Sequence, residues 1–248
     1  MQVEHFGKVA LIRINAGKAN ALSEKSLTGL GGCLDQVVAS DARALVLTGY
    51  DKFFCAGLSL PSLLGLDRPA MSAFMGLFSD VMVRVFTWPR PVVAAINGYA
   101  VAGGCVLALQ ADVRLMRDDV GKIGLTEVGL GLGLPPVALE VLRCLVPTPS
   151  LLPVALEGRL LSPNEARELD VIHEVCPAED LEARALRRAE HMAKLPAQAF
   201  AKIKNGLRQP VVEVIRQRER AEGEAWLDAW FSAETQAALP KAVTKLSS

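Results

Sequence analysis

The chain has 248 residues, enough to bury one large hydrophobic core or a core with a smaller appendage. Hydrophobic residues make up 51% of it and charged residues 22%, with no uninterrupted apolar run long enough to cross a bilayer, so we expect a soluble, well-buried protein and no membrane partner. Lysine plus arginine and aspartate plus glutamate number 27 each, so no overall field recruits nucleic acid, and an anionic ligand must be held by local groups.

The cysteines and the first residues indicate the compartment. Five cysteines are widely spaced, without a CxxC pair or a histidine at metal-ligand spacing. We therefore expect reduced, mostly buried thiols and no metal site. The first fifteen residues lack the basic start and apolar core of a secretion signal, and they alternate in polarity as a β-strand does. The prediction is a cytoplasmic protein.

Strand and helix patterns alternate along the first part of the chain. Strand patterns cover residues 9–15, 42–49, 90–98 and 111–116. Helical patterns cover residues 23–39, 69–86, 104–111 and a stretch that begins at Pro136. This rhythm favours an α/β fold in which helical crossovers join parallel strands that are buried on both faces.

From Ser162 onward the signals are helical. Ser162, Pro163 and Glu165 have the pattern of a capped helix start. Residues 196–248 predict an all-helical tail whose aromatic side carries Trp226, Trp230 and Phe231. Two uses of that aromatic side remain open, packing on the chain's own domain and packing at a subunit interface.

One carboxylate stands out in the sequence. From Ile123 to Leu139 the only ionisable side chain is Glu127, set among leucines, glycines and prolines. Burying a charged carboxylate is costly unless hydrogen bonds or a shifted pKa compensate. Glu127 is therefore either a loop residue bonded to backbone amides or a functional acid.

Two segments run from an apolar strand into a turn of small residues and then into a helix. They cover residues 45–64 and 91–112. Such turns leave backbone N–H groups without partners, and the first turn of a helix carries partial positive charge. Two turns of this kind that face one point would hold an oxygen anion, although tight packing alone also explains glycines at such positions.

Nucleotide motifs do not account for these glycines. Gly98 and Gly103 have the spacing of a P-loop, but Gly104 and Cys105 follow where lysine and serine or threonine are needed. The glycines of residues 129–133 do not form GxGxxG and lead into two prolines. A phosphate-binding loop of either kind is not predicted.

Nucleophilic catalysis is also not predicted. Ser59 lacks the second glycine of a nucleophile elbow and has no histidine placed to serve it. The histidines His5, His173 and His191 are scattered along the chain. Cys105 opens a helix without a paired base, so we do not assign it as a nucleophile.

Taken together, three segments in this order and spacing resemble the crotonase (enoyl-CoA hydratase/isomerase) superfamily. They are TGYDKFFCAGLSL, PVVAAINGYAVAGGCVLALQADVRLM and KIGLTEVGLGLGLPP. The resemblance extends from NALS at 20–23 through LLSPNEARELDVIHEV to the helical tail. It implies a core of repeated ββα turns over residues 1–195, and a helical region over 196–248 that forms homotrimers or hexamers.

The resemblance also implies a ligand and a chemistry. The ligand is an acyl thioester of coenzyme A, needed as substrate with no other cofactor, whose carbonyl oxygen is held by the amides of Leu58 and Gly103. The family's hydratases carry two glutamates, and the matching positions here are Val106 and Glu127. Only one of the two carboxylates is present in this chain.

A single carboxylate suits the movement of a double bond better than the addition of water. One base removes the proton at C2 of a 3-enoyl thioester and returns it at C4, while the oxyanion hole stabilises the dienolate. The segments AVAGGCVLAL and IGLTEVGLG resemble those of mitochondrial Δ3,Δ2-enoyl-CoA isomerases in particular. Apolar surroundings would raise the pKa of Glu127 and match it to this role in fatty acid β-oxidation.

Further substrate contacts follow from the resemblance. Lys18 is placed near the coenzyme phosphates and Ala56 near its adenine and pantetheine. The remaining predicted contacts are Ala19, Gly57, Ser59, Leu60, Gly104 and Val106. Two positions depart from the family pattern, because Ser59 replaces an aspartate and Asp170 replaces a glycine.

Other functions stay open at this point. One group is a hydratase, hydrolase or decarboxylase of the same superfamily, acting on CoA or carrier-protein thioesters. The other is a thioester-binding module without turnover. The presence or absence of activity on 3-enoyl-CoA and 2-enoyl-CoA distinguishes them.

Overall fold

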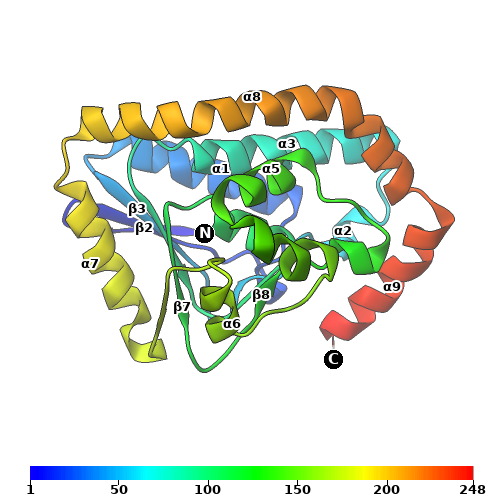
Figure 1. Ribbon diagram of the computed structural model, residues 1–248, viewed down its shortest axis with the longest axis horizontal. Helices are drawn as coiled ribbons and strands as arrows, with labels where there is room; N and C mark the ends of the chain where they lie inside the picture. The colour runs from blue at the N-terminus through cyan, green and yellow to red at the C-terminus, as the bar shows by residue number, and fades with distance from the viewer. Residues whose placement is uncertain (248) are drawn as a thin grey trace.

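A computed structural model of the chain describes residues 1–247, with side chains for residues 1–243. Its centre is a six-stranded sheet in the order β1-β2-β3-β5-β7-β9, in which β1 and β2 are antiparallel and the other neighbours parallel (Figure 1). The strands are β1 (Gln2–Phe6), β2 (Val9–Arg13), β3 (Ala44–Thr48), β5 (Val92–Ile96), β7 (Val113–Arg117) and β9 (Glu174–Cys176). The central strands β3 and β5 are buried along their whole length, as their continuous apolar runs predict.

A smaller sheet of three parallel strands lies beside the first. Its strands are β4 (Phe53–Cys55), β6 (Tyr99–Val101) and β8 (Ile123–Gly124), in that order. Each of them follows a strand of the large sheet after a short turn, and helical structure comes next. The predicted α/β fold with ββα repeats is confirmed.

The helices cover both faces of the large sheet. They are α1 (Glu24–Ala39), α2 (Leu60–Leu63), α3 (Arg68–Phe86), α4 (Gly103–Leu109), α5 (Pro136–Leu145), α6 (Pro163–Glu168), α7 (Leu181–Ala193), α8 (Ala197–Trp230) and α9 (Ala233–Ser247). Short helical turns are η1 (Lys18–Asn20), η2 (Glu127–Leu130), η3 (Thr148–Ser150), η4 (Leu152–Leu156) and η5 (Ala178–Asp180). The predicted capped start is present at α6, where the Ser162 side chain and Glu165 form a capping box.

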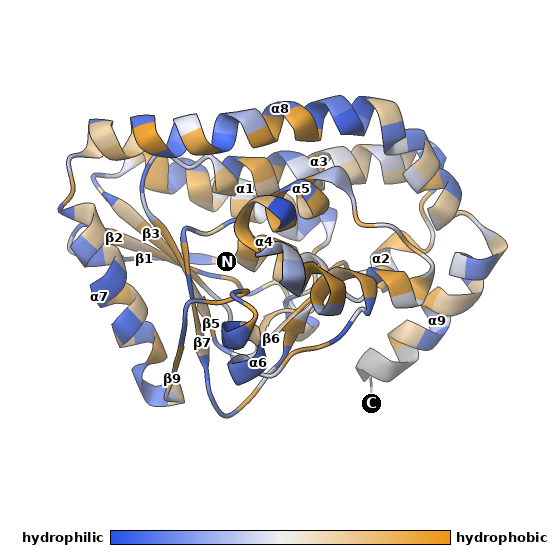
Figure 2. Ribbon diagram, viewed as in Figure 1, coloured by the Kyte–Doolittle hydropathy of each residue, from blue (hydrophilic) through white to orange (hydrophobic). Residues whose placement is uncertain are grey.

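Successive side chains of each strand point to opposite faces of the sheet, and this divides the hydrophobic core into two clusters. In β2, Ala10 and Ile12 face the main cluster under α1, α3, α5 and α8, whereas Val9 and Leu11 face α7. Figure 1 shows α7 against one side of the sheet and α8 running across the helical layer on the other, and Figure 2 shows hydrophobic residues gathered on the strands between them. Each face of the sheet is therefore buried by its own helices.

Helix α3 is long and apolar enough, by length and composition, to cross a membrane. Its buried residues include Met71, Phe74 and Phe78, which belong to the main hydrophobic cluster of the chain. Helices at the centre of a folded domain have the same composition, and α3 packs as one of them.

The predicted helical tail consists of two helices, with a break at Phe231 and Ser232 between α8 and α9. Trp226 and Trp230 stack with ring centroids 5.7 Å apart and pack on the main cluster. Of the two uses left open, this aromatic pair serves the chain's own domain, while Phe231 stays 37% exposed.

Buried charges fix α8 to the sheet. Asp112, just before β7, accepts from Lys204 Nζ and pairs with Arg208, each at 2.7 Å, and also accepts from the amide of Val92 at 2.7 Å. All three side chains are at most 12% exposed. Because each charge has a partner, the long helix can lie on the ends of β5 and β7 without leaving an isolated buried ion.

Candidate active site

Glu127 opens the turn η2, three residues after the end of β8. The turn is closed by the amide of Leu132, which donates to the Glu127 carbonyl at 3.1 Å, and by Gly131, whose φ of +74° reverses the chain. A residue other than glycine is disfavoured in that conformation. The backbone around Glu127 is therefore fixed by local hydrogen bonds, which leave its side chain free to point elsewhere.

The Glu127 carboxyl group points into the protein. The residue as a whole is only partly buried, yet its Oε2 atom is buried and has no hydrogen-bond partner among the described residues. Burial raises the pKa of this carboxyl from 4.5 to about 7, although the backbone amides of Glu127 and Thr126 pull the pKa in the opposite direction. A carboxyl group with this pKa both accepts and returns protons near neutral pH.

Leu58 lies in the turn after β4, where a parallel bridge joins it to Leu22. The bridge uses the neighbours of Leu58: the Leu22 amide donates to the Gly57 carbonyl at 2.7 Å, and the Ser59 amide donates to the Leu22 carbonyl at 2.8 Å. In this pattern the Leu58 N–H faces away from Leu22. No hydrogen bond from it to another described residue is formed.

Gly103 is the first residue of α4, so its amide has no acceptor within the helix. It follows Ala102, which has φ +51° and ψ −120°, a conformation that costs a residue with a side chain. As with Leu58, the Gly103 N–H donates to no other group in residues 1–247. Two free amides thus end two separate turns.

Glycine packing brings these turns together. A Cβ atom on Gly104 would lie 1.9 Å from the carbonyl oxygen of Cys55, so only glycine allows α4 to approach the end of β4 this closely. A Cβ atom on Gly103 would be in contact with the Leu58 side chain at 3.4 Å. The amide-bearing turns are therefore neighbours in space.

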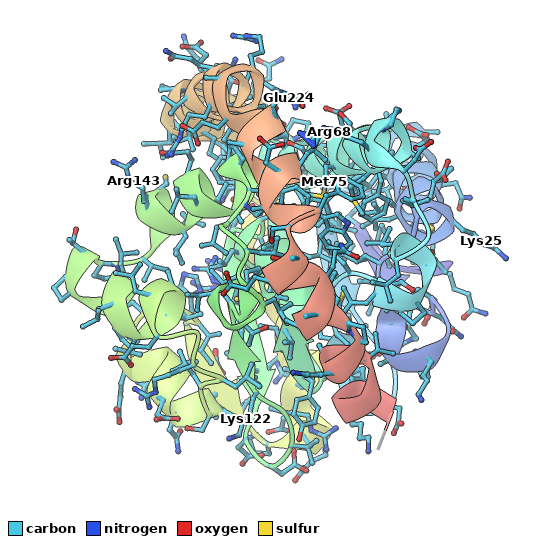
Figure 3. All side chains as sticks on the ribbon, turned by 90° about the vertical axis from the view of Figure 1, so that its right-hand side faces the viewer. Lys25, Arg68, Met75, Lys122, Arg143 and Glu224 are labelled. Atoms are coloured by element: carbon cyan, nitrogen blue, oxygen red, sulfur yellow. The ribbon has the colours of Figure 1, made fainter. Side chains whose placement is uncertain are left out.

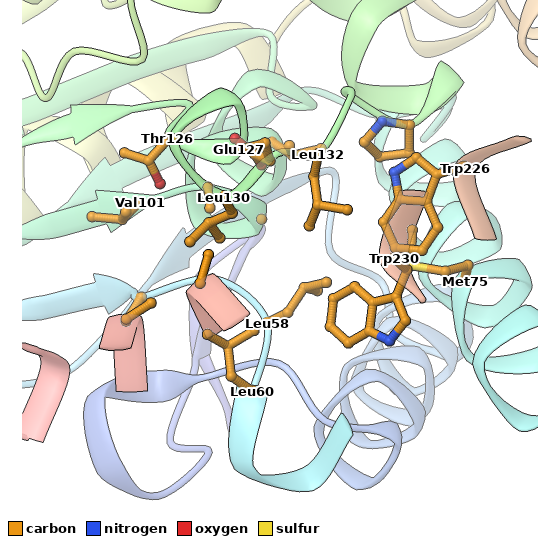
Figure 4. A pocket seen from close by; sticks show the side chains of 18 of the residues that line it. Leu58, Leu60, Met75, Val101, Thr126, Glu127, Leu130, Leu132, Trp226 and Trp230 are labelled. Atoms are coloured by element: carbon orange, nitrogen blue, oxygen red, sulfur yellow. The ribbon is translucent and has the colours of Figure 1, made fainter. Parts of the chain in front are cut away.

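A cavity of about 700 Å³ joins the three functional positions. Leu58, Gly103 and Glu127 all line it, and Figure 4 shows the side chains of Leu58 and Glu127 at the cavity. Most of the other lining side chains are apolar, among them Met75, Phe78, Val101, Leu130, Leu132, Trp226 and Trp230. Size and lining are those of a site for a small molecule with an apolar portion.

The remaining predicted contacts divide into two groups. Ala56, Leu60 and Val106 line the cavity. The others, which do not, are Lys18, Ala19, Gly57, Ser59 and Gly104. Gly57 and Gly104 do not line the cavity, but the absence of a side chain at each allows the two amide-bearing turns to pack against each other.

The turn at residues 18–19 lies one layer away from the cavity. The carbonyl of Ala19 accepts from the amide of Ala56 at 3.0 Å, so this turn supports the cavity wall. Lys18 is exposed beside it, and its contact with coenzyme phosphates stays a prediction. Ser59 precedes α2 and bonds Leu22 through its amide.

Sequence reasoning missed the part of the cavity that the tail supplies. Trp226 and Trp230 of α8 line it, as do Glu234 and Lys241 of α9. The sequence shows that the tail has an aromatic side, but it does not indicate that this side packs at the cavity. Helix α9 carries no motif that would have indicated a position next to Glu127.

Other reactive groups do not form a second centre here. Burial, together with the charge of Glu127, raises the pKa of the Cys105 thiol, which makes it a poor nucleophile. His173 accepts from the amide of Arg114 at 3.0 Å, and burial lowers its pKa to about 4. Within the described residues, no group of three or more histidine, cysteine, aspartate or glutamate side chains could hold a metal ion.

The sequence profile of a family described as enoyl-CoA hydratase/isomerase matches residues 4–240. The chain belongs to the enoyl-CoA hydratase/isomerase family, that is, to the crotonase superfamily. An acyl-CoA thioester substrate is consistent with this membership, and the protein is an enzyme of this superfamily.

Some proteins similar to this chain are named hydratases and others are named isomerases. A Thermus thermophilus protein that bears the name enoyl-CoA hydratase is 37% identical over 204 residues, 78% of each chain. A structure of an enoyl-CoA isomerase from Mycobacterium tuberculosis matches with a TM-score of 0.82 at 25% identity, covering 87% of this chain and 94% of the other. Human mitochondrial Δ3,Δ2-enoyl-CoA isomerase shares the fold, with a TM-score of 0.94 at 24% identity. The match covers 99% of this chain and 97% of the human one.

Proposed function

We propose that this enzyme is a Δ3,Δ2-enoyl-CoA isomerase that moves the double bond of a 3-enoyl-CoA into conjugation with the thioester. The observation that carries the proposal is the pairing of one buried carboxyl, Glu127, with an apolar side chain, Val106, in the same cavity. Val106 is 1% exposed. By the resemblance in sequence, it matches the first of the two glutamate positions of hydratases.

The proposed reaction starts with proton abstraction. The Glu127 carboxylate takes a proton from C2, the C2–H electrons form a C1=C2 bond, and the carbonyl electrons move to oxygen. The resulting dienolate oxygen accepts hydrogen bonds from the amides of Leu58 and Gly103. In the return step the oxygen electrons re-form the carbonyl, the C1=C2 electrons move to form the C2=C3 double bond, and the C3=C4 electrons take the proton from Glu127 at C4.

The pKa of Glu127 supports both halves of this cycle. A carboxyl with a pKa of about 7 is a stronger base than one with a pKa of 4.5, and once protonated it still gives up its proton readily. The cavity wall near the proposed dienolate is apolar, which strengthens the hydrogen bonds of the two amides.

A hydratase is the second candidate, and the names of the relatives favour it. Hydration needs a group that activates water and a group that delivers a proton. In the described part of the cavity the other carboxylate is Glu234 of α9, which is exposed, whereas the Oε2 atom of Glu127 is buried. This contrast supports isomerisation over hydration.

Incubation with two substrates tests the proposal. The wild-type enzyme is expected to convert 3-hexenoyl-CoA to the conjugated 2-enoyl thioester, followed by ultraviolet absorbance, and to leave crotonyl-CoA unhydrated. Hydration of crotonyl-CoA at a comparable rate would identify a hydratase. Release of free CoA or of carbon dioxide from suitable thioesters would indicate a hydrolase or a decarboxylase, and binding without turnover would indicate a binding module.

We also propose that the enzyme assembles as a homotrimer or as a dimer of trimers. Support comes from apolar side chains on the surface of the single chain: Ile203 and Leu207 of α8 are 64% and 69% exposed, and Leu152 and Leu156 of η4 are 55% and 70% exposed. Light scattering coupled to size exclusion measures the assembly, and a monomer at micromolar concentration would contradict it.

A further inference from the structure

A second cavity of about 270 Å³ lies behind the first. The two cavities share four wall residues, Met75, Phe78, Pro135 and Trp226. Met75 and Phe78 belong to α3, Pro135 immediately precedes α5, and Trp226 belongs to α8. The two cavities are therefore adjacent, and these side chains form a wall that they share.

Trp226 is the largest and best-fixed part of that wall. Its indole N–H donates to the carbonyl oxygen of Gly133 at 3.0 Å. One face of the indole stacks on Trp230, which is 1% exposed, at an interplanar angle of 20°. Held at its edge and on its face, the ring cannot rotate out of the wall without losing both contacts.

The wall lies where the acyl group of a bound thioester would point. In Figure 4, Glu127 and Leu58 face the cavity in its middle, and Leu132, Trp226, Trp230 and Met75 follow on one side. The polar lining residues Glu234 and Lys241 come from α9 instead. With the carbonyl at the Leu58 amide and C2 at Glu127, an apolar chain is best buried toward the two indoles.

The second cavity can take more of such a chain. Its wall includes Val137 of α5 and Leu227 of α8, together with the shared Met75 and Phe78. Its outer part is polar: the Ser79 hydroxyl donates to Glu219, and Arg216 pairs with Glu219 at 2.8 Å. Glu224, held by Arg68 at 3.1 Å, also lines this cavity, and Figure 3 labels it together with Arg68 and Met75.

We infer that Trp226 is the residue that determines acyl-chain length in this enzyme. It ends the acyl site at the first cavity and so restricts the enzyme to short and medium chains, and it separates that site from the second cavity. This inference rests on the proposed function for the placement of the thioester carbonyl. It states where the far end of the acyl chain binds, a question that the reaction at C2 and C4 does not answer.

Binding of saturated acyl-CoA esters, which have no double bond to move, tests the inference. Each buried methylene group tightens Kd about fourfold, so Kd falls with chain length until the site is full. In calorimetric titrations with esters of four to sixteen carbons, wild type is expected to show a break point among the short and medium chains, before the longest ester is reached. Trp226→Ala is expected to move the break point by at least about two methylene groups, which at about fourfold each tightens the longest ligands by about 16-fold or more.

Two further variants separate opening of the wall from other effects. Trp226→Phe keeps an apolar ring but loses the bond to Gly133, and it is expected to keep the wild-type break point. Gly223 lies one turn before Trp226 and lines the second cavity, with nothing within 4 Å of a Cβ placed on it. Adding Gly223→Leu to Trp226→Ala is expected to fill the second cavity and restore the original break point.

The outcomes are distinct. An unchanged break point in Trp226→Ala, an equal change in Trp226→Phe, or a wild type without any break would overturn the inference. Circular dichroism and a Kd for butyryl-CoA within threefold of wild type establish that a variant is folded, and Trp226→Leu replaces the alanine variant if that one does not fold. The proposed function is tested separately: if it is wrong, the wild-type enzyme does not isomerise 3-hexenoyl-CoA, whatever the titrations show.

Discussion

A Cβ atom on Gly57 would lie 3.2 Å from the amide nitrogen of Gly103, so the two turns that supply the proposed oxyanion donors are in direct contact. Gly57 has φ +91°, and the same Cβ would lie 2.8 Å from the carbonyl oxygen of Val101. Gly57→Ala is therefore expected to push the Leu58 amide away from the Gly103 amide. Loss of one oxyanion donor reduces kcat by about 10²–10³-fold, and we expect a decrease in that range on 3-hexenoyl-CoA.

Gly65→Ala is the matched control for this change. Nothing lies within 4 Å of a Cβ placed on Gly65, and its φ is not positive. The control is expected to retain wild-type kcat. If Gly57→Ala also kept kcat within threefold of wild type, the contact between the two turns would not position the donors.

Glu127→Gln removes the acid–base group while keeping its shape. The expected result is a fall in kcat of about 10²–10⁴-fold, the usual contribution of a general acid or base. In wild type, kcat/KM is expected to rise with pH up to about 7, because the base form of Glu127 is populated as pH passes its pKa. Steady-state rates between pH 5 and 9 check both statements, with exposed Glu157→Gln as the control.

The raised pKa of Glu127 also predicts how stability depends on pH. The folded state binds this proton more tightly than the unfolded state, so the contribution is complete below about pH 4.5 and is lost as pH rises to about 7. Its size is about 3 kcal/mol at most. Urea unfolding across this range is expected to show a smaller loss of stability in Glu127→Gln than in wild type, and parallel curves would mean that the carboxyl is not shielded from solvent.

Val106→Glu tests the reason for preferring isomerisation. The variant places a second carboxyl in the cavity that Glu127 lines, at the position proposed to match the other glutamate of hydratases. Weak hydration of crotonyl-CoA is expected to appear, at the cost of stability because Val106 is 1% exposed. Val106→Gln has a similar size but no acid, so hydration by both variants would refute the explanation.

Asp112→Ala tests the attachment of α8. The variant leaves Lys204 and Arg208 as buried cations without a carboxylate, and it is expected to lower the free energy of unfolding by about 3–5 kcal/mol. Asp119→Ala, which removes an exposed partner of Arg117, is expected to cost about 1 kcal/mol or less. Denaturant unfolding measures both, and equal effects would show that the buried pair contributes no more than a surface one.

Sequence and structure agree best where a pattern depends on local chemistry. Strands β3 and β5 were predictable because parallel strands buried on both faces are apolar throughout. Strands β4, β6 and β8 have only two or three residues, too few for any periodicity to appear, so the residue pattern did not indicate them and only the resemblance implied ββα repeats. The same applies to β9, whose three residues pair with β7.

The candidate site was predictable to the extent that its residues are unusual in sequence. Glu127 is a lone carboxyl in an apolar segment, and such a residue is readily noticed. Trp226 and Lys241 reach the cavity only because α8 and α9 fold back over the core, which depends on tertiary packing. Asp170, a departure from the family's glycine, has φ +57°, a conformation that aspartate tolerates, so the turn is kept.

The small sheet of β4, β6 and β8 has a consequence for how the enzyme loses activity. Leu58, Gly103 and Glu127 each follow the end of one of its strands within three residues, so strands of two or three residues align all the groups proposed to act on the substrate. Such a short ladder opens more easily than the long strands beside it. On warming, the enzyme is therefore expected to lose activity while most of its secondary structure is intact, and on cooling the activity is expected to return.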